Sequence, residues 1–360
     1  MSTPVQKSVP LTCSGHTRPV VHLEFSELQD DGTYSLLSSC KDGNPMLRDW
    51  LGDWVGTFLG HKGAVWCSKL SGGEASLAVT ASADFSAKVW DTFTGSCLHT
   101  FPHNHIVRSA AINARGTRIL TGGHEKKLRL FDLSRPDAEP DYLLIDGEKG
   151  TAHDGTIKSV VWHRHLDGST GPTATATGAG AGAGAATATS NGRGTRGNGA
   201  AGASEDSVVV SAGEDRTVRW WDTRTLRKTH ELKFDDPITS MERSYGSLGE
   251  ILTVTSGKKV LFIDAASRTP LQTHTLPITP SSVSLHPTLG DRFVAGATED
   301  GWVRVYDFAT GQERELHKGH HGPVHCVSYS PDGELAASGS EDGTIRLWQT
   351  WPSKRYGLWT

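Results

Sequence analysis

The sequence predicts an all-β protein, a ring of seven four-stranded blades. The first observation is a repeat, because closing aromatic or apolar residues recur about every 41–43 residues along most of the chain. These residues are Trp90, Phe131, Trp221, Ile263, Tyr306 and Trp348. The second observation is a Gly-His pair that precedes several repeats, as at Gly60-His61 and Gly319-His320. A period of about 40–45 residues with Gly-His and Trp-Asp signatures is typical of a β-propeller.

Counting from Gly15-His16 gives seven repeats of the WD type. Their anchor positions are His16, His61, His103, His153, Phe234, Leu276 and His320. Four residues after each anchor stands the residue expected to begin the first strand of the blade: Val20, Val65, Val107, Ile157, Ile238, Pro280 and Val324. Pro280 is the one poor fit. Seven such blades close a ring that has no long free edge.

The apolar segment from Val9 to Cys13 precedes the first Gly-His pair. We expect it to form a strand that completes the last blade and so joins the two ends of the chain. Residues 1–360 then form a single domain, because the repeat overrides the prior of about two domains that the length alone suggests.

One interval between closing residues is about twice the others, from Phe131 to Trp221. It contains a Gly/Ala/Thr-rich insertion at about residues 166–205, which lacks apolar side chains from Ser169 to Ala203 apart from alanine and Pro172. Such a composition cannot offset its ordering entropy, so a disordered loop is expected between the first two strands of the fourth blade. The stretch from Arg193 to Gly197 could contact RNA, but a low-complexity spacer is the simpler interpretation.

Composition restricts the location and the class of partner. No apolar run approaches the ~20 residues that cross a bilayer, and residues 1–7 have no apolar core of a secretory signal. Five cysteines without a Cys-x-x-Cys pair indicate reduced thiols, so we expect a cytoplasmic and nuclear protein without membrane insertion. The net charge of −4 provides no field that would attract nucleic acid, so RNA contact is expected only indirectly.

A histidine, a hydroxyl residue, an aspartate and a tryptophan recur together in three repeats. The sets are His61, Thr80, Asp84 and Trp90; His153, Ser211, Asp215 and Trp221; and His320, Ser338, Asp342 and Trp348. A hydrolase needs one such set in one cleft, with an oxyanion hole. Three copies, one per blade, predict hydrogen-bond networks that satisfy buried polar groups. No catalytic residue is therefore assigned, and the protein is not expected to be an enzyme.

Other repeats depart from this set. The first has His16, Ser38 and Asp42, but Arg48 stands at the tryptophan position. The third joins His103 and Thr121 to Glu125 and Phe131. The fifth and sixth lack the histidine, so apolar packing is expected to hold them.

The sequence predicts no metal, cofactor or small-molecule site. His103 and His105 could share one strand face, but no third ligand is placed by the sequence. No P-loop, dinucleotide-binding glycine motif or nucleophile elbow is present.

A propeller offers a face for partners instead. Residues beside the tight turns of the blades should line one rim, and the early blades contribute basic groups whereas the later blades contribute acidic ones. The candidate partner-binding rim comprises Lys41, Lys62, His124, Glu214, Glu299 and Glu341. Separated arcs of opposite charge would orient a charged partner. Solvated turn charges without a binding role are an equally open interpretation.

Four strings go beyond the generic repeat. They are Leu11–Val21, Cys40–Arg48, Gly56–Trp66 and Tyr356–Trp359. Together they resemble the family of the serine-threonine kinase receptor-associated protein, also called unr-interacting protein, over the whole chain except the insertion. The third string also resembles the propeller subunit of eukaryotic translation initiation factor three, which is the alternative. The strings at Cys40–Arg48 and Tyr356–Trp359 favour the first family.

The resemblance implies a non-enzymatic adaptor. Family members associate with the survival-of-motor-neuron complex, which loads Sm proteins onto spliceosomal small nuclear RNAs. They also bind a cold-shock-domain RNA-binding protein and, in animals, growth-factor receptor kinases. The partners that the resemblance implies are therefore proteins, namely Sm-loading components, an RNA-binding protein and a receptor kinase.

Overall fold

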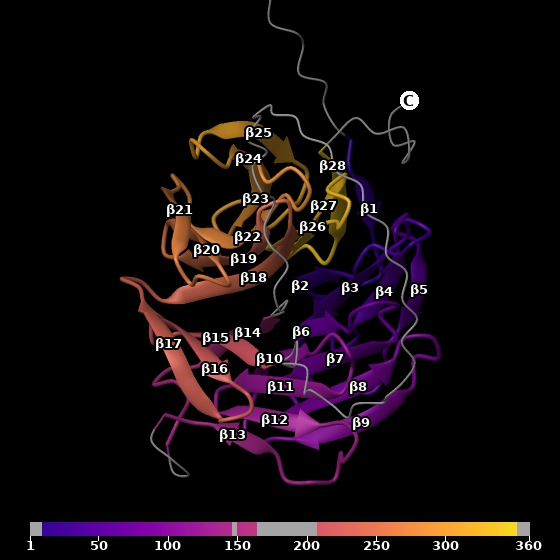
Figure 1. Ribbon diagram of the computed structural model, residues 1–360. Helices are drawn as coiled ribbons and strands as arrows, with labels where there is room; N and C mark the ends of the chain where they lie inside the picture. The colour runs from indigo at the N-terminus through magenta and orange to yellow at the C-terminus, as the bar shows by residue number, and fades with distance from the viewer. Residues whose placement is uncertain (1–8, 146–149, 164–206, 351–360) are drawn as a thin grey trace, which may run out of the picture.

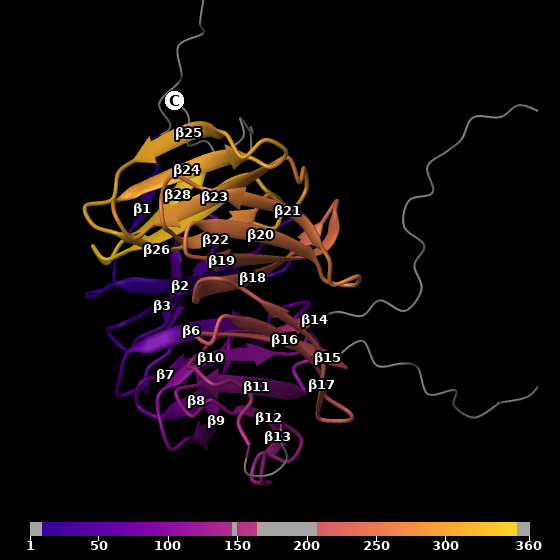
Figure 2. The ribbon, with the colours of Figure 1, turned by 90° about the vertical axis from the view of Figure 1, so that its left-hand side faces the viewer.

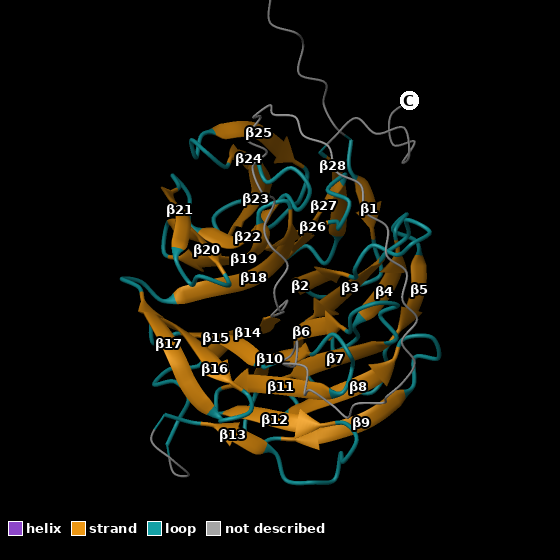
Figure 3. Ribbon diagram, viewed as in Figure 1, coloured by secondary structure: helices purple, strands orange, loops and turns teal. Residues whose placement is uncertain are grey.

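The computed structural model describes residues 9–145, 150–163 and 207–350. Within these ranges the chain forms 28 strands in seven four-stranded antiparallel sheets, and it contains no helix (Figures 1 and 3). The predicted all-β propeller of seven blades is therefore confirmed. The predicted disordered insertion at about residues 166–205 lies outside the described ranges.

Each blade is a meander in which consecutive strands pair. The first blade contains β2 (Val20–Phe25), β3 (Ser35–Cys40), β4 (Met46–Asp49) and β5 (Trp54–Thr57). The second contains β6 (Val65–Leu70), β7 (Leu77–Ser82), β8 (Ser86–Asp91) and β9 (Cys97–Pro102). The third contains β10 (Val107–Ile112), β11 (Arg118–Gly123), β12 (Leu128–Asp132) and β13 (Asp141–Leu143). The fourth contains β14 (Ile157–His163), β15 (Val208–Gly213), β16 (Thr217–Asp222) and β17 (Arg227–Lys233).

The last three blades follow the same order. The fifth contains β18 (Ile238–Gly246), β19 (Gly249–Ser256), β20 (Lys259–Asp264) and β21 (Pro270–Thr275). The sixth contains β22 (Pro280–Leu285), β23 (Arg292–Ala297), β24 (Trp302–Asp307) and β25 (Glu313–Lys318). The seventh contains β26 (Val324–Tyr329), β27 (Leu335–Ser340), β28 (Ile345–Gln349) and, from the start of the chain, β1 (Leu11–Cys13).

The first strand of every blade begins at the residue four positions after its anchor, as the repeat predicts. This holds even for Pro280, which opens β22 and pairs with Ala297. Proline is tolerated at the first residue of a strand, because the missing N–H is not needed there. These first strands lie nearest the centre of the ring, and the fourth strands lie at its outside (Figure 1).

The ring is closed by β1, which pairs antiparallel with β28. Leu11 lies opposite Leu347, and Cys13 lies opposite Ile345. Figure 2 shows β26 of the last blade beside β2 of the first. The closing strand is shorter than the segment that the sequence predicts, because Val9 is exposed. Closure by an N-terminal strand is nevertheless confirmed.

Apolar clusters between neighbouring blades form the core. One cluster joins Cys13 and Val20 at the start of the chain to Cys326 and Ile345 near its end. In the fifth and sixth blades the residues at the anchor positions are apolar. Phe234 packs against one cluster, and Leu276 is buried in the next. The insertion lies in the sequence between His163 and Val208, and these two residues pair across β14 and β15. It therefore joins adjacent ends of two paired strands.

Candidate protein-binding face

The histidine network of the second blade lies inside the sheet of that blade. The Nδ1 atom of His61 lies 2.7 Å from Asp84 Oδ2, and its Nε2 atom lies 2.7 Å from Thr80 Oγ1. Trp90 Nε1 donates to the same hydroxyl at 2.8 Å. Asp84 thus accepts the His61 N–H, and the Thr80 hydroxyl is held between histidine and tryptophan. Every polar group of the set has a partner inside the blade.

The fourth and seventh blades repeat this geometry. His153 Nε2 lies 2.7 Å from Ser211 Oγ, and Trp221 Nε1 donates to that oxygen at 2.8 Å. The corresponding distances to Ser338 Oγ are 2.7 Å from His320 Nε2 and 2.8 Å from Trp348 Nε1. Nδ1 of His153 lies 2.9 Å from Asp215, and Nδ1 of His320 lies 3.0 Å from Asp342.

The aspartates of these networks have lower pKa values in the folded protein than a free aspartate has. Burial alone would raise the pKa of Asp342, but backbone and hydroxyl donors from His321 and Thr344, together with His320, hold it well below its usual range. The same balance holds for Asp84 and Asp215, and it lowers the pKa of Asp42 to about 2. Burial also lowers the pKa of His153 and His320, against the opposing effect of Asp215 and Asp342, and so favours the neutral imidazole.

Two blades differ from the complete set. In the first, Arg48 replaces the tryptophan, and its guanidinium donates to the carbonyl oxygens of Gly52 and Ser14. In the third, His103 Nε2 lies 2.8 Å from Thr121 Oγ1, but its Nδ1 lies 3.0 Å from the carbonyl oxygen of Phe101. Glu125 stands at the acidic position of this repeat, but its carboxylate accepts from Arg129, with Nε at 3.0 Å.

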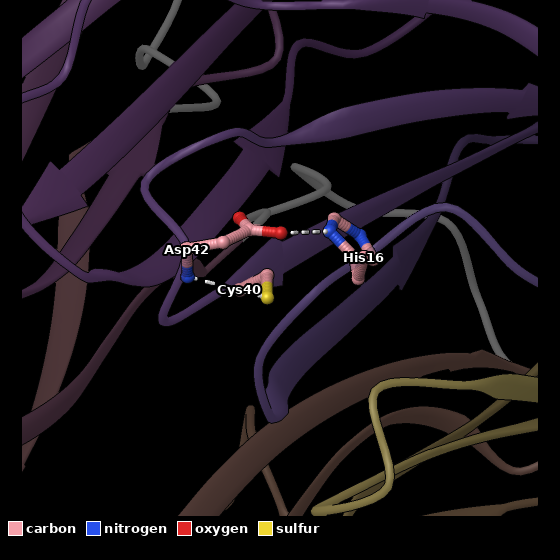
Figure 4. A group of neighbouring side chains, drawn as sticks. All are labelled: His16, Cys40 and Asp42. Carbon is pink, nitrogen blue, oxygen red and sulfur yellow. Dashed lines mark hydrogen bonds and ion pairs between the residues drawn. The ribbon is translucent and has the colours of Figure 1, made fainter.

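A cluster of possible metal ligands lies in the first blade, and the sequence analysis did not identify it. One ligand atom each from His16, Cys40 and Asp42 lies within 4.8 Å of the others (Figure 4). His16 is already bonded to Asp42 at 3.1 Å and to Ser38 at 2.8 Å. Burial raises the pKa of Cys40 to about 12, so its sulfur is a thiol that donates to a backbone carbonyl. Metals prefer the thiolate. The cluster is better described as a blade network in which Cys40 makes the bonds that Ser82 and Ser340 make in the second and seventh blades.

The six candidate rim residues lie on tight turns at one face of the ring. Five of them are exposed, and Lys41 is partly buried. The basic and acidic arcs meet, because the first and last blades are neighbours: Lys41 Nζ lies 3.8 Å from Glu341 Oε2. Glu214 pairs with Lys158 at 2.7 Å, and Glu299 accepts from Thr279 at 2.7 Å. His124 stacks on His105 with ring centroids 5.0 Å apart.

A hollow of about 450 Å³ opens on this face at the centre of the ring. Every blade contributes the second residue of its first strand: Val21, Trp66, Arg108, Lys158, Thr239, Ser281 and His325. Lys41 and Glu214 from the rim also line it. The sequence analysis missed these lining residues. The fixed offset of five residues after each anchor would have identified them.

The floor of this hollow carries buried charge. Lys69, Glu242 and Leu23 line it, and they also line a second hollow of about 390 Å³ toward the opposite face. Lys69 Nζ lies 3.1 Å from Glu24 Oε1. Glu242 Oε1 accepts from Ser284 and Ser328 at 3.2 and 3.1 Å. Burial raises the pKa of Glu242 to about 7, against the opposing effect of Lys69.

Comparison with known proteins agrees with this architecture. The family model "WD domain, G-beta repeat" matches residues 52–91, 95–132, 198–222 and 311–349. The serine-threonine kinase receptor-associated protein of Bos taurus is 44% identical over 98% of this chain and 86% of its own length. That of Dictyostelium discoideum is 43% identical over 94% of this chain and 98% of its own length.

The chain belongs to the serine-threonine kinase receptor-associated protein family. The family assignment made from the four strings is confirmed. Eukaryotic translation initiation factor 3 subunit I of Culex quinquefasciatus is 23% identical over 94% of this chain and 95% of its own length. This is a more distant similarity. As a WD-repeat member of the serine-threonine kinase receptor-associated protein family, the chain is an adaptor that binds other proteins. The described residues include no helix that could span a membrane.

Proposed function

We propose that this chain is a non-enzymatic adaptor in the assembly of spliceosomal small nuclear ribonucleoproteins. It would hold protein partners within the survival-of-motor-neuron complex that loads Sm proteins, and it would act in both cytoplasm and nucleus. The observation that carries this proposal is the similarity of 43–44% to family members along almost the whole chain. The names of those relatives also motivate scaffolding of a receptor kinase as a second setting for the same binding face.

The geometry of the blade networks supports a binding role over catalysis. A hydrolytic nucleophile must reach its substrate, with a base beside it and an oxyanion hole opposite. Thr80, Ser211 and Ser338 are fully buried, and each already accepts a tryptophan N–H. The polar groups that remain open to partners lie on the turns of the rim and in the central hollow. A rigid ring with such a face can hold several proteins at fixed positions.

The experiment is affinity purification of the full chain from its own cells, followed by mass spectrometry. We expect to recover Sm-loading components and an RNA-binding protein. RNA should be recovered only through those proteins, and a high-salt wash of the nuclease-resistant complexes should remove it. Recovery of initiation-factor subunits without Sm-loading components would contradict the proposal. It would favour the translation role that the more distant similarity suggests.

A further inference from the structure

Two cationic side chains lie near the ring of Trp66 at the edge of the central hollow. It is the second residue of β6, and the guanidinium carbon of Arg108 lies 3.7 Å from its ring centroid. Lys41 Nζ lies 5.9 Å from the same ring. The three residues come from three consecutive blades, and all of them line the hollow. Cations over an indole face are attracted by its quadrupole, and the ring holds a guanidinium in a fixed orientation.

The cations around the hollow differ in how their charge is balanced. Lys158 pairs with Glu214 at 2.7 Å, and Lys69 pairs with Glu24 at 3.1 Å. Among the residues that the structure describes, no carboxylate or carbonyl oxygen is found within hydrogen-bonding distance of the Arg108 guanidinium. Burial lowers the pKa of Arg108, with a partly compensating attraction from Glu214. A guanidinium has five N–H donors and stays charged in proteins. Arg108 is therefore a partly desolvated cation whose donors are free for a ligand.

We propose that this hollow is a carboxylate-binding site for an isolated acidic side chain of a partner protein. Arg108 is the principal contact, Trp66 is the platform that orients it, and Lys41 is the second cation. Guanidinium and carboxylate match as planar, bidentate partners. The volume of about 450 Å³ falls within the usual range of about 300–1,000 Å³ for ligand pockets. The identity of the ligand as part of a protein rests on the proposed adaptor function.

The surrounding charges favour an isolated carboxylate over a polyanion. Glu214 and Glu242 line the same hollow, and Glu341 lies beside Lys41. The whole chain has a net charge of −4. A phosphate backbone would bring several negative charges against these groups, whereas one side-chain carboxylate meets a single unpaired guanidinium. Repulsion between like charges at an interface selects against the wrong partner.

The test is a titration of the full chain into a fluorescently labelled Gly/Ser peptide that carries a single Glu. The matched ligand replaces that Glu by Gln. Fluorescence anisotropy should detect binding of the acidic peptide only, and the affinity should fall as salt rises. Arg108→Gln should weaken binding roughly ten- to hundredfold, which is the usual effect of losing a charged hydrogen-bonded pair. Arg227→Gln makes the same change of charge on the exposed outer strand β17 and should leave the affinity unchanged.

Trp66→Phe provides a second variant that retains an aromatic side chain. It should weaken binding several-fold, because phenylalanine is the poorer platform for a cation. Thermal melting should show that each variant is folded. Equal binding of the neutral peptide, or unchanged binding by both folded variants, would refute the site. Tighter binding of a single-stranded RNA that competes with the peptide would also refute it and would assign the hollow to nucleic acid.

The peptide titration and the affinity purification together distinguish the carboxylate site from the proposed assembly function. Loss of Sm-loading components from the purified complexes, with acidic-peptide binding that still depends on Arg108, would remove the assembly role and leave the carboxylate site intact. Purification of those components without any acidic-peptide binding would remove the site alone.

Discussion

At the scale of single residues, Asp342 shows how much one carboxylate can organise. Its Oδ2 atom accepts from His320 Nδ1 at 3.0 Å and from the backbone N–H of His321 at 2.9 Å. Its Oδ1 atom accepts from the backbone N–H and the hydroxyl of Thr344 at 2.9 and 2.7 Å. Four donors from three residues therefore converge on one side chain.

Asp342→Ala should lower the free energy of unfolding by roughly 1–3 kcal/mol, because donors that are shielded from water lose their acceptor. Chemical denaturation measures this change. Glu341→Ala is the matched control, since it removes the neighbouring, exposed acid. A folded Asp342→Ala protein of undiminished stability that had lost partner binding would make Asp342 a contact residue instead.

The same networks predict a loss of stability in acid. The pKa values of Asp42, Asp84, Asp215 and Asp342 are lower in the folded protein than the ordinary value of 3.8. Their stabilising contribution is therefore complete above that value, and it is lost as the pH falls through the lower folded values. We expect the free energy of unfolding to decline steeply below about pH 4, as denaturant titrations across acidic pH would measure. A flat profile there would contradict the networks.

The buried carboxyl group of Glu242 predicts that the free energy of unfolding changes with pH in the opposite direction. Its pKa is about 7 in the folded protein, above the ordinary 4.5, so folding favours its protonated form. Stability is then lost as the pH rises from about 4.5 to 7, where the unfolded chain ionises first. Glu242→Gln should raise the free energy of unfolding at pH 8 more than at pH 5, by roughly 1–3 kcal/mol. Glu299→Gln removes an exposed carboxylate and serves as the control; equal gains at both pH values would disprove the prediction.

At the scale of elements, the three-residue strand β1 determines whether the ring is closed. Leu11 and Cys13 pack against Leu347, and both approach Gly52 of the first blade. Gly52 has a φ of +88°, and an added Cβ would lie 3.0 Å from these side chains. The closing strand therefore fits against a turn where glycine relieves both strain and crowding.

Deletion of residues 1–13 should destabilise the protein by roughly 2–5 kcal/mol, because Cys13 and the partly buried Leu11 are lost from the apolar cluster between the last and first blades. It should also cause aggregation, since β28 would become a free edge. Thermal melting and size-exclusion chromatography measure the two effects. Deletion of residues 1–8 leaves β1 complete and is the control. If both truncated proteins had the same melting temperature as the full chain, β1 would have no part in closing the ring.

At the scale of the whole molecule, the rim and the central hollow present charge to partners on one face. Changing both Lys41 and Lys62 to Glu should slow association with the purified partner by roughly tenfold at low salt. The effect should shrink as salt rises, because the Debye length is only about 8 Å at physiological ionic strength. Surface plasmon resonance at several salt concentrations measures this rate.

The control for this prediction reverses Arg227 and Lys233, which are exposed on the outer strand β17. Both reversed proteins should remain folded, since none of the four side chains belongs to a blade network. An association rate that the Lys41 and Lys62 reversal does not change, even at low salt, would exclude the rim from binding.

The sequence by itself determined the blades. Anchor residues, strand starts and closing residues recur at fixed offsets, and a strand that pairs with its sequence neighbour needs only local information. Thus Val65, Pro280 and Val324 each begin a first strand where the repeat places them. The partners of His61, His153 and His320 follow from the same repeat, because each network closes within one blade.

Only the tertiary structure decided which side chains meet between blades and which charged groups compete within one blade. Lys41 meets Glu341 because the ring brings the first and last blades together, although 300 residues separate them in the sequence. Trp66, Arg108 and Lys41 converge because the first three blades pack side by side in the ring. In the third blade, Arg129 competes for Glu125 and leaves His103 to a backbone carbonyl. Such pairings depend on distances across the ring and on competition among charges, which no local pattern of residue types encodes.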